Sequence, residues 1–297
     1  MRLRLVWQSG LFELFDSLRS RRALVVLVIY LAASLLGMNG TISALGKIES
    51  QLAGVLAVET PADGRSGVIS KTLWQSDHFK RMVRRSVGNS LVYDDICGKH
   101  PAELLYAWLA FMFVPLFTIL VASNRIADDV RSGAVRYMLT RVTRLEWTLG
   151  KFFGNALLLA AGILLGSVAA WCVAAFRLAG ADIVMLFPGM LAWGLKAWAY
   201  SLAWLGLALG VSHIARSGTR ATSIGVFALV AWSAASASLA HFGERFSVLA
   251  RLFPSSVENM LWRSSFAPVA CGTAWLLLLG LLYLSFGYFV FSRRDVR

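Results

Sequence analysis

The sequence predicts an all-α polytopic membrane protein with six transmembrane helices. Its 297 residues are 58% hydrophobic and only 15% charged, with a mean hydropathy of +0.65. Uncharged apolar runs near 20 residues recur along the chain, and a helix needs about 20 such residues to cross a bilayer of roughly 30 Å. Because a helix satisfies its own backbone hydrogen bonds, it is also the element that lipid tolerates. A soluble domain of this length would not repeat such runs.

The distribution of Lys and Arg predicts that both termini are cytoplasmic. Sixteen of these residues fall in segments assigned to the cytoplasm and four in the short outer segments, which is the asymmetry of the positive-inside rule. The net charge of +13 is spread around the apolar runs and forms no single patch. We therefore expect membrane lipid headgroups, and no nucleic acid, as partners of these cations. Three widely spaced cysteines predict no disulfide framework.

Residues 1–22 predict a cytoplasmic interfacial helix. Apolar side chains recur at helical spacing, whereas Glu13, Asp16 and Arg19 lie mostly off that stripe. The pair Arg21-Arg22 resembles a twin-arginine export signal, but the chain stays apolar past any cleavage site, so we expect no cleavage. The apolar stripe comprises Leu3, Val6, Trp7, Gly10, Leu11, Leu14, Phe15 and Leu18.

The six spans are separated by charged or turn-forming segments. We expect Pro115 to kink the second span, and Pro188-Gly189 to divide an interfacial stretch, 183–187, from the fourth. A cytoplasmic tail, 292–297, follows the last span. The predicted spans are 23–45, 104–123, 147–176, 189–211, 221–239 and 269–291.

Two outer segments are predicted to be helical. The extracytoplasmic insert 46–103, between the first two spans, carries eight basic and seven acidic residues, and Trp74 to Val87 follow helical spacing, so a protein partner could dock there. The segment 241–268 contains Ser255 to Glu258, a capping-box pattern that predicts a short amphipathic helix.

One short stretch of the insert gathers metal-ligating residue types. Asp94, Asp95, Cys97 and His100 crowd into the sequence DDICGKH. Their spacing matches no defined metal site. We favour a solvated loop before a helix and predict neither a metal nor a bound cofactor.

The connector 124–146 is the most strongly charged segment between two spans. Its first half predicts a short helix that ends near Gly133, because glycine is common just past a helix end. Asp128 and Asp129 lie in the first turns, where the helix dipole favours anions. Thr143 and Glu146 form a capping-box pattern that begins the helix of the third span.

Lys196 lies about two turns inside the fourth span. A central lysine would cost on the order of 2.5–3.5 kcal/mol on insertion scales, but near the outer rim it can reach water. We favour snorkelling or an interhelix bond for Lys196. The alternative is a role in a substrate pathway.

These features together resemble the permease subunits of ABC-2-type transporters, a family that includes the nitrous-oxide-reductase maturation and gliding-motility permeases. The N-terminal helix resembles the family's interfacial helix, and Leu252-Phe-Pro254 resembles its outer element. The connector, from Asp129 through Gly133 to Gly150-Lys151, is similar to the family's charged segment. The tail Phe291-Ser-Arg-Arg-Asp-Val296 is similar to the family's closing motif. Asp129, Ala134 and Arg141 depart from the family's usual Glu, Thr and Pro.

The resemblance implies that the connector is a cytoplasmic coupling helix that inserts into a separate ABC ATPase subunit. The complex would hold two ATPase copies and a second permease copy, identical or paralogous, in the bacterial inner membrane. Each Gly-Lys pair of the chain lacks a following Ser or Thr, so ATP and Mg would bind the partner. The implied coupling residues are Arg125, Asp128, Asp129, Arg131, Gly133, Arg136, Arg141 and Arg144.

Two other classes of function remain as alternatives. A polytopic scaffold or sensor would act through the insert 46–103. An intramembrane enzyme would need acid, base or metal ligands at membrane depth, and the predicted spans offer little beyond Lys196 and Cys172. A transporter subunit without its own enzymatic site is the reading we favour. Its substrate, and the direction of transport beyond the family's habit of export, are not encoded in these motifs.

Overall fold

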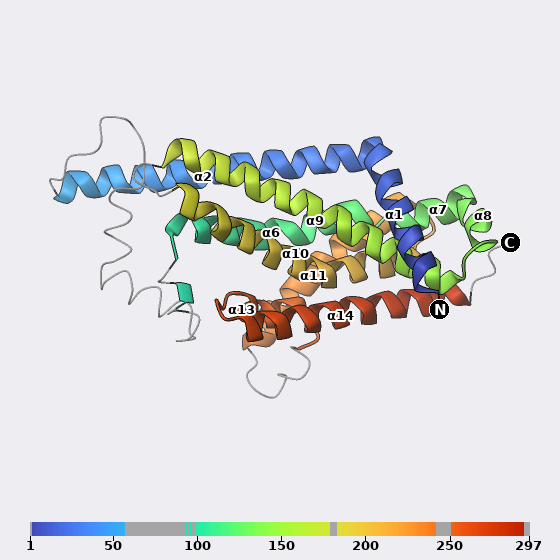
Figure 1. The fold of residues 1–297 in the computed structure, drawn as a ribbon. Coiled ribbons are helices and arrows are strands. Elements are labelled where there is room, and N and C mark those ends of the chain that lie inside the picture. Colours follow the sequence, from blue (N-terminus) through green and yellow to red (C-terminus); the bar gives the residue numbers. More distant parts are fainter. Residues whose placement is uncertain are drawn as a thin grey trace.

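The computed structural model describes residues 2–56, 93, 95–96, 99–178, 183–241 and 251–293, and within them the chain is almost entirely helical. The long helices lie side by side in one elongated bundle (Figure 1). The predicted all-α class is therefore confirmed. The long helices are α2 (Arg21–Leu56), α6 (Pro101–Ala122), α9 (Arg144–Arg177), α10 (Ile183–Ile214), α11 (Gly218–His241) and α14 (Phe266–Ser292).

Five helical segments of the described residues are long and apolar enough to cross a membrane. The fifth predicted crossing, 221–239, falls on α11, which is not among them. A total of six crossings therefore stays a prediction. The five segments are Ala23–Lys47, Pro101–Ser132, Arg144–Arg177, Val184–Ile214 and Phe266–Ser292.

The N-terminal helix α1 (Leu3–Arg19) is present as predicted, and it meets α2 at a sharp elbow (Figure 1). Ser20, between the two helices, has an extended backbone and ends α1. The side of α1 that faces the bundle carries polar residues, since Glu13 and Ser17 are buried. Much of the apolar stripe points outward, with Leu3 75% and Phe15 62% exposed.

Helix α10 lies at the centre of the bundle and packs against α6, α9 and α14. Glycines allow α10 and α14 to approach backbone to backbone: a Cβ placed on Gly206 would overlap the Gly280 carbonyl, and one on Gly210 would meet the Tyr283 carbonyl at 2.6 Å. Small residues at such crossings are how helices gain contact in lipid, where burial of apolar surface drives little association.

Three local expectations differ from the structure. Helix α10 runs from Ile183 to Ile214 without the division expected at Pro188-Gly189, because neighbouring helices can accommodate the carbonyl that a proline frees. Helix α2 continues past residue 45 to Leu56, into the predicted insert. The rest of that insert up to residue 92 lies outside the described residues.

The outer capping box is the third difference. A 3-10 turn, η2 (Pro254–Val257), precedes the four-residue helix α13 (Glu258–Leu261), and neither has a side-chain cap. Ser255, the N-cap position of the expected box, lies within the 3-10 turn. Proline at the first position starts the turn without a lost backbone donor.

Candidate functional site

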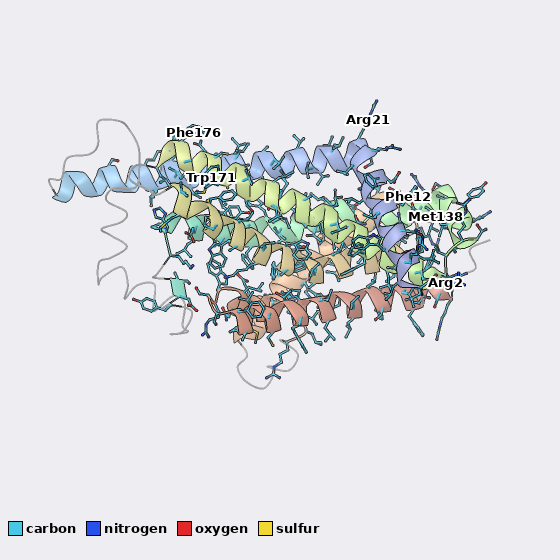
Figure 2. All side chains as sticks on the ribbon, viewed as in Figure 1. Arg2, Phe12, Arg21, Met138, Trp171 and Phe176 are labelled. Atoms are coloured by element: carbon cyan, nitrogen blue, oxygen red, sulfur yellow. The ribbon has the colours of Figure 1, made fainter. Side chains whose placement is uncertain are left out.

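The charged connector folds into two short helices, α7 (Arg125–Ser132) and α8 (Ala134–Leu139), at the same end of the bundle as α1. Figure 2 places Arg2, Phe12 and Met138 at this end and Trp171 and Phe176 at the other. Gly133 separates α7 from α8 with a φ of +76°, in the left-handed region that favours glycine. The predicted end of the first helix near Gly133 is confirmed.

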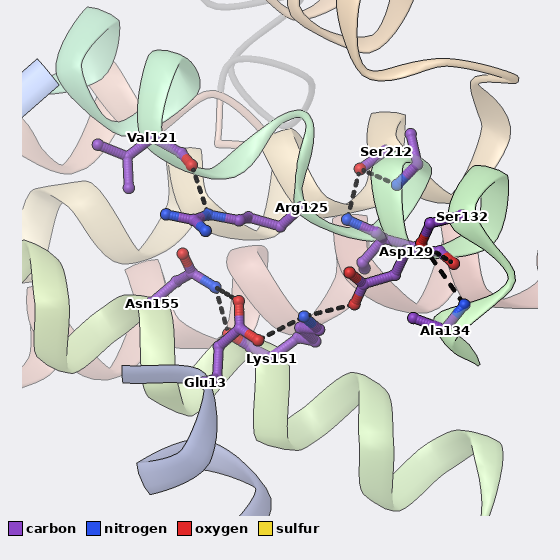
Figure 3. A network of polar contacts seen from close by, with 11 residues as sticks. Glu13, Val121, Arg125, Asp129, Ser132, Ala134, Lys151, Asn155 and Ser212 are labelled. Atoms are coloured by element: carbon purple, nitrogen blue, oxygen red, sulfur yellow. Dashed lines mark hydrogen bonds and ion pairs between the residues drawn. The ribbon is translucent and has the colours of Figure 1, made fainter. Parts of the chain in front are cut away.

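The N-terminus of α7 is capped from another helix. Its own N-cap residue, Asn124, makes no side-chain cap. The hydroxyl of Ser212, near the end of α10, accepts hydrogen bonds from the backbone N–H of Ile126 at 3.1 Å and of Ala127 at 3.0 Å. Ser212 thus supplies what a local cap would supply, and it ties the start of α7 to α10 (Figure 3).

A network of three charged side chains joins α7, α9 and α1, with Lys151 and Glu13 buried and Asp129 partly exposed. The Lys151 ammonium, on α9, lies 2.6 Å from a carboxylate oxygen of Asp129 on α7 and also donates to the Glu13 carboxylate on α1. The side chains of Lys151 and Glu13 are 8% and 5% exposed. Asn155 donates to the Lys151 carbonyl at 2.9 Å (Figure 3). We call Glu13, Asp129 and Lys151 the ion triad.

The ion triad exists because α1 and α9 approach closely. Gly10 of α1 lies against Gly150 and Gly154 of α9: a Cβ on Gly154 would meet the Gly10 carbonyl at 2.5 Å and the Glu13 Cβ at 2.8 Å. Three positions without side chains therefore bring the Glu13 carboxylate within reach of Lys151. Because an unpaired buried charge is costly, the pairing requires α1 to turn its acidic side, and not its apolar stripe, toward the bundle.

The start of α9 is fixed by the predicted capping box, which is confirmed. Thr143 accepts from the Glu146 backbone N–H at 3.3 Å, and the Glu146 carboxylate accepts from the Thr143 N–H at 3.0 Å. The other Glu146 oxygen accepts from the Arg2 backbone N–H at 2.8 Å. Arg144 donates to the Ser292 carbonyl at 2.9 Å, which links α9 to the end of α14. The connector is thus bonded to both ends of the chain.

The residues predicted to couple to a partner divide into two groups. Arg125, Asp128, Asp129 and Arg144 are partly buried and make contacts within the bundle; Arg125, for example, donates to the Val121 carbonyl at 3.2 Å. Arg131, Arg136 and Arg141 are exposed. Tyr137, on α8, is 81% exposed. We call Arg131, Arg136, Tyr137 and Arg141 the outward face of the connector, a basic and aromatic surface.

A cavity of about 170 Å³ lies between the α1–α2 elbow and α7. Asp16 and Ser20 line it from the elbow, and Arg125, Asp128 and Lys151 line it from the other side. Seven of its eleven lining residues are charged or polar, and the other four are apolar. The connector is held against the bundle by discrete polar bonds around this space, while α7 buries only Ile126 and Ala127.

Sequence reasoning missed Glu13 and Ser212 and did not assign a structural role to Lys151. Lys151 was visible as a cation of the connector's charged stretch, and Glu13 as an acid off the apolar stripe. Their pairing spans 138 residues, so no local pattern announces it. Ser212 is an ordinary span-terminal serine in the sequence.

Lys196 lies in the half of α10 that is farther from the connector. Its ammonium donates to the Arg263 carbonyl at 2.9 Å and lies 4.0 Å from the Trp193 ring centroid. The Arg263 side chain donates to Asp95 at 3.0 Å. Nearby, the Trp262 indole donates to Glu258 at 3.2 Å, and burial raises the pKa of the Glu258 carboxyl. The bond of Lys196 therefore reaches the segment between α13 and α14, and not another helix. Its role in a pathway stays a prediction.

The sequence DDICGKH is only partly described. Asp94 and Cys97 lie outside the described residues, Asp95 pairs with Arg263, and His100 accepts from the Ala102 backbone N–H at 3.2 Å. The described part of the chain contains no group of three His, Cys, Asp or Glu side chains placed to hold a metal.

Comparison with known proteins agrees with this architecture. The profile of the ABC-2 family transporter protein matches residues 11–296, nearly the whole chain. The chain is similar to a probable ABC transporter permease protein, NosY, of Stutzerimonas stutzeri, with 32% identity over 123 residues. That match covers 35% of this chain and 45% of the relative, so it spans less than half of the relative's length. On the family match, the chain belongs to the ABC-2 family of transporter proteins as a membrane permease component, which lacks an ATPase site of its own.

Proposed function

We propose that this permease couples ATP hydrolysis by a separate ABC ATPase subunit to export or extraction of a substrate. The observation that carries the proposal is the ion triad: Lys151 on α9 pairs with Asp129 on α7 and Glu13 on α1. A force applied to α7 therefore reaches α9 and α1 at the same point, the Lys151 side chain. Rigid-body tilting of packed helices is an established way to transmit such a force.

The outward face of the connector is the surface that we propose for the ATPase. Arg136, Tyr137 and Arg141 are exposed, in contrast to Glu13 and Lys151, which are buried. Arginine and tyrosine are enriched in protein interfaces. The chain has no G-x-x-x-x-G-K-[ST] sequence, so ATP and Mg would lie on two ATPase copies. The cavity beneath α7 would give the connector room to move.

For the topology, we propose six crossings with both termini in the cytoplasm of a bacterial inner membrane. Helix α11 has 24 residues, about 36 Å at 1.5 Å per residue, which is enough for a bilayer of roughly 30 Å. Ile224, Phe227 and Val230 on α11 are 47%, 74% and 62% exposed, as expected for side chains that face lipid. If α11 crosses the membrane outward, α14 crosses back. Helix α14 then ends on the side of α1 and α7, where the bundle carries most of its basic segments.

A second permease copy, identical or paralogous, would complete the pathway, because six spans form half of one. In this arrangement we propose that Lys196 fixes α10 to the segment before α14. Its bonds to Arg263 and Trp193 support a structural role over contact with substrate.

The test is purification of the complex after charge reversal on the outward face. We expect Arg136→Glu together with Arg141→Glu to remove most of the ATPase subunit that copurifies with the full-length permease. Stimulation of ATP hydrolysis by the permease should fall with it, while expression and thermal unfolding of the permease stay unchanged, because both side chains are exposed.

The matched control is Arg216→Glu, an exposed arginine in the short segment between α10 and α11. This variant makes the same kind of charge change outside α7 and α8 and should retain the ATPase. Full copurification and stimulation in the double variant would overturn the proposal. Equal loss in the Arg216 variant would also do so, since general electrostatic attraction would then replace a defined interface.

A further inference from the structure

A groove lies between α1 and α9, and the coupling function proposed above does not use it. It encloses about 560 Å³, within the range of roughly 300–1,000 Å³ for pockets that take small organic molecules. Leu3, Val6 and Trp7 line it from α1, and Phe152 and Phe153 line it from α9. Its walls are apolar apart from Arg4 at its edge.

The groove remains open although its walls are large hydrophobic side chains. Trp7 contacts Phe153 with ring centroids 4.9 Å apart, yet Trp7 is 53% and Leu3 75% exposed. The exposure continues along α1 to Phe15 and Leu18, at 62% and 43%. A continuous apolar surface of this kind marks a site of contact with membrane or protein. An amphipathic helix with tryptophan beside arginine suits the headgroup region of a bilayer.

The charge around the groove decides which lipid it suits. Arg4 is exposed and makes no ion pair within the described ranges. Glu13, one of two acidic residues of α1, points away from this surface and forms an ion pair with Lys151. The exposed charges of α1 are therefore mostly arginines, which attract an anionic headgroup.

We infer that the α1–α9 groove is a specific site for an anionic phospholipid, given the cytoplasmic placement of α1 that belongs to the proposed function. One acyl chain lies against Trp7, Phe152 and Phe153, and the phosphate group lies at Arg4. The site adjoins the glycine contact of Gly10 with Gly150, so a bound lipid stabilises the packing that holds Glu13 at Lys151.

The experiment uses the full-length permease in lipid nanodiscs that contain photoreactive phosphatidylglycerol or photoreactive phosphatidylcholine, followed by peptide mapping. We expect labels concentrated on residues 3–7 and 149–153, with phosphatidylglycerol preferred. Arg4→Gln should lower that preference about fivefold, the factor that about 1 kcal/mol per basic residue near a membrane gives. Trp7→Ala should reduce labelling by both lipids and leave their ratio unchanged.

Arg19→Gln is the matched control, because it removes an exposed arginine at the other end of the same helix. A diffuse surface attraction would respond equally to both arginine variants, and that result would overturn a specific site. Equal labelling by the two lipids, or labels spread evenly over the lipid-facing spans, would overturn it as well. Cross-links between two permease copies at the groove, with the groove protected from lipid labels, would also overturn it. These readouts do not depend on ATPase capture, so either proposal can fail alone.

Discussion

Lys151 on α9 and Asp129 on α7 form an ion pair, with 2.6 Å between the ammonium nitrogen and the nearer carboxylate oxygen. The same ammonium pairs with Glu13 on α1. One cation therefore joins α1, the connector and a long apolar helix.

Removal of the Lys151 charge should destabilise the permease strongly. Lys151→Met leaves two carboxylates facing each other without a cation, and breaking a buried ion pair costs about 3–5 kcal/mol. Lys151→Arg should retain much of the stability, because it keeps the charge. Thermal unfolding of the purified chain in detergent measures both. An unfolding midpoint of Lys151→Met equal to that of the unchanged protein would refute the structural importance of the ion triad.

Enlargement of Gly154 should separate α1 from α9. Gly154→Leu places side-chain atoms where the Gly10 carbonyl and Glu13 lie, and overpacking of this kind costs about 1–3 kcal/mol. Gly40→Leu is the matched control, because a Cβ at Gly40 meets nothing within 4 Å. We expect protease cleavage within α1 to rise only in the Gly154 variant. Equal cleavage in both variants would contradict the close packing of α1 on α9.

Loss of the Ser212 hydroxyl should loosen the start of α7. Ser212→Ala removes the acceptor of the Ile126 and Ala127 amides, and loss of a helix cap costs about 0.5–2 kcal/mol. Hydrogen exchange of these amides should accelerate. In the control, Ser236→Ala, the serine bonds only within its own helix, to Ser233. Unchanged exchange in the Ser212 variant would show that the cap does not hold α7.

Replacement of Gly133 should strain the junction between α7 and α8. Gly133 has a φ of +76°, and a Cβ at this position would meet no atom within 4 Å. Gly133→Ala should therefore cost about 1–2 kcal/mol through backbone strain alone. Gly133→Asn should cost less, because asparagine adopts this conformation more readily. Chemical unfolding of the two variants gives the comparison. Equal stability of the alanine and glycine proteins would mean that the junction is not held left-handed.

The long helices could be predicted from the sequence because each depends on a local property, a run of apolar residues. The same holds for the Thr143–Glu146 capping box and for the end of α7 at Gly133, where the signal lies within a few residues. The division expected at Pro188 is absent, because the effect of this proline on α10 depends on the helices beside it. The orientation of α1 was also unpredictable, since the apolar stripe points outward once Glu13 pairs with Lys151.

The candidate site was predictable as a charged connector and not as a network. The arginines of the outward face and the acids of α7 lie in one stretch of sequence. Glu13 reaches the same place from α1, through the contact of Gly10 with Gly154, and Ser212 reaches it from α10. Contacts between residues so far apart in the sequence depend on how the helices cross, which hydrophobic periodicity does not specify.

A photo-cross-link from the outward face tests whether the connector binds an ABC ATPase subunit. Tyr137 is replaced with p-benzoylphenylalanine in the full-length chain in cells, where its exposed position leaves the fold unperturbed. The account predicts one dominant cross-linked product, identified by mass spectrometry as an ABC ATPase subunit, which disappears with Arg136→Glu and Arg141→Glu. Cross-links to lipid alone, or to an extracytoplasmic protein, would contradict it.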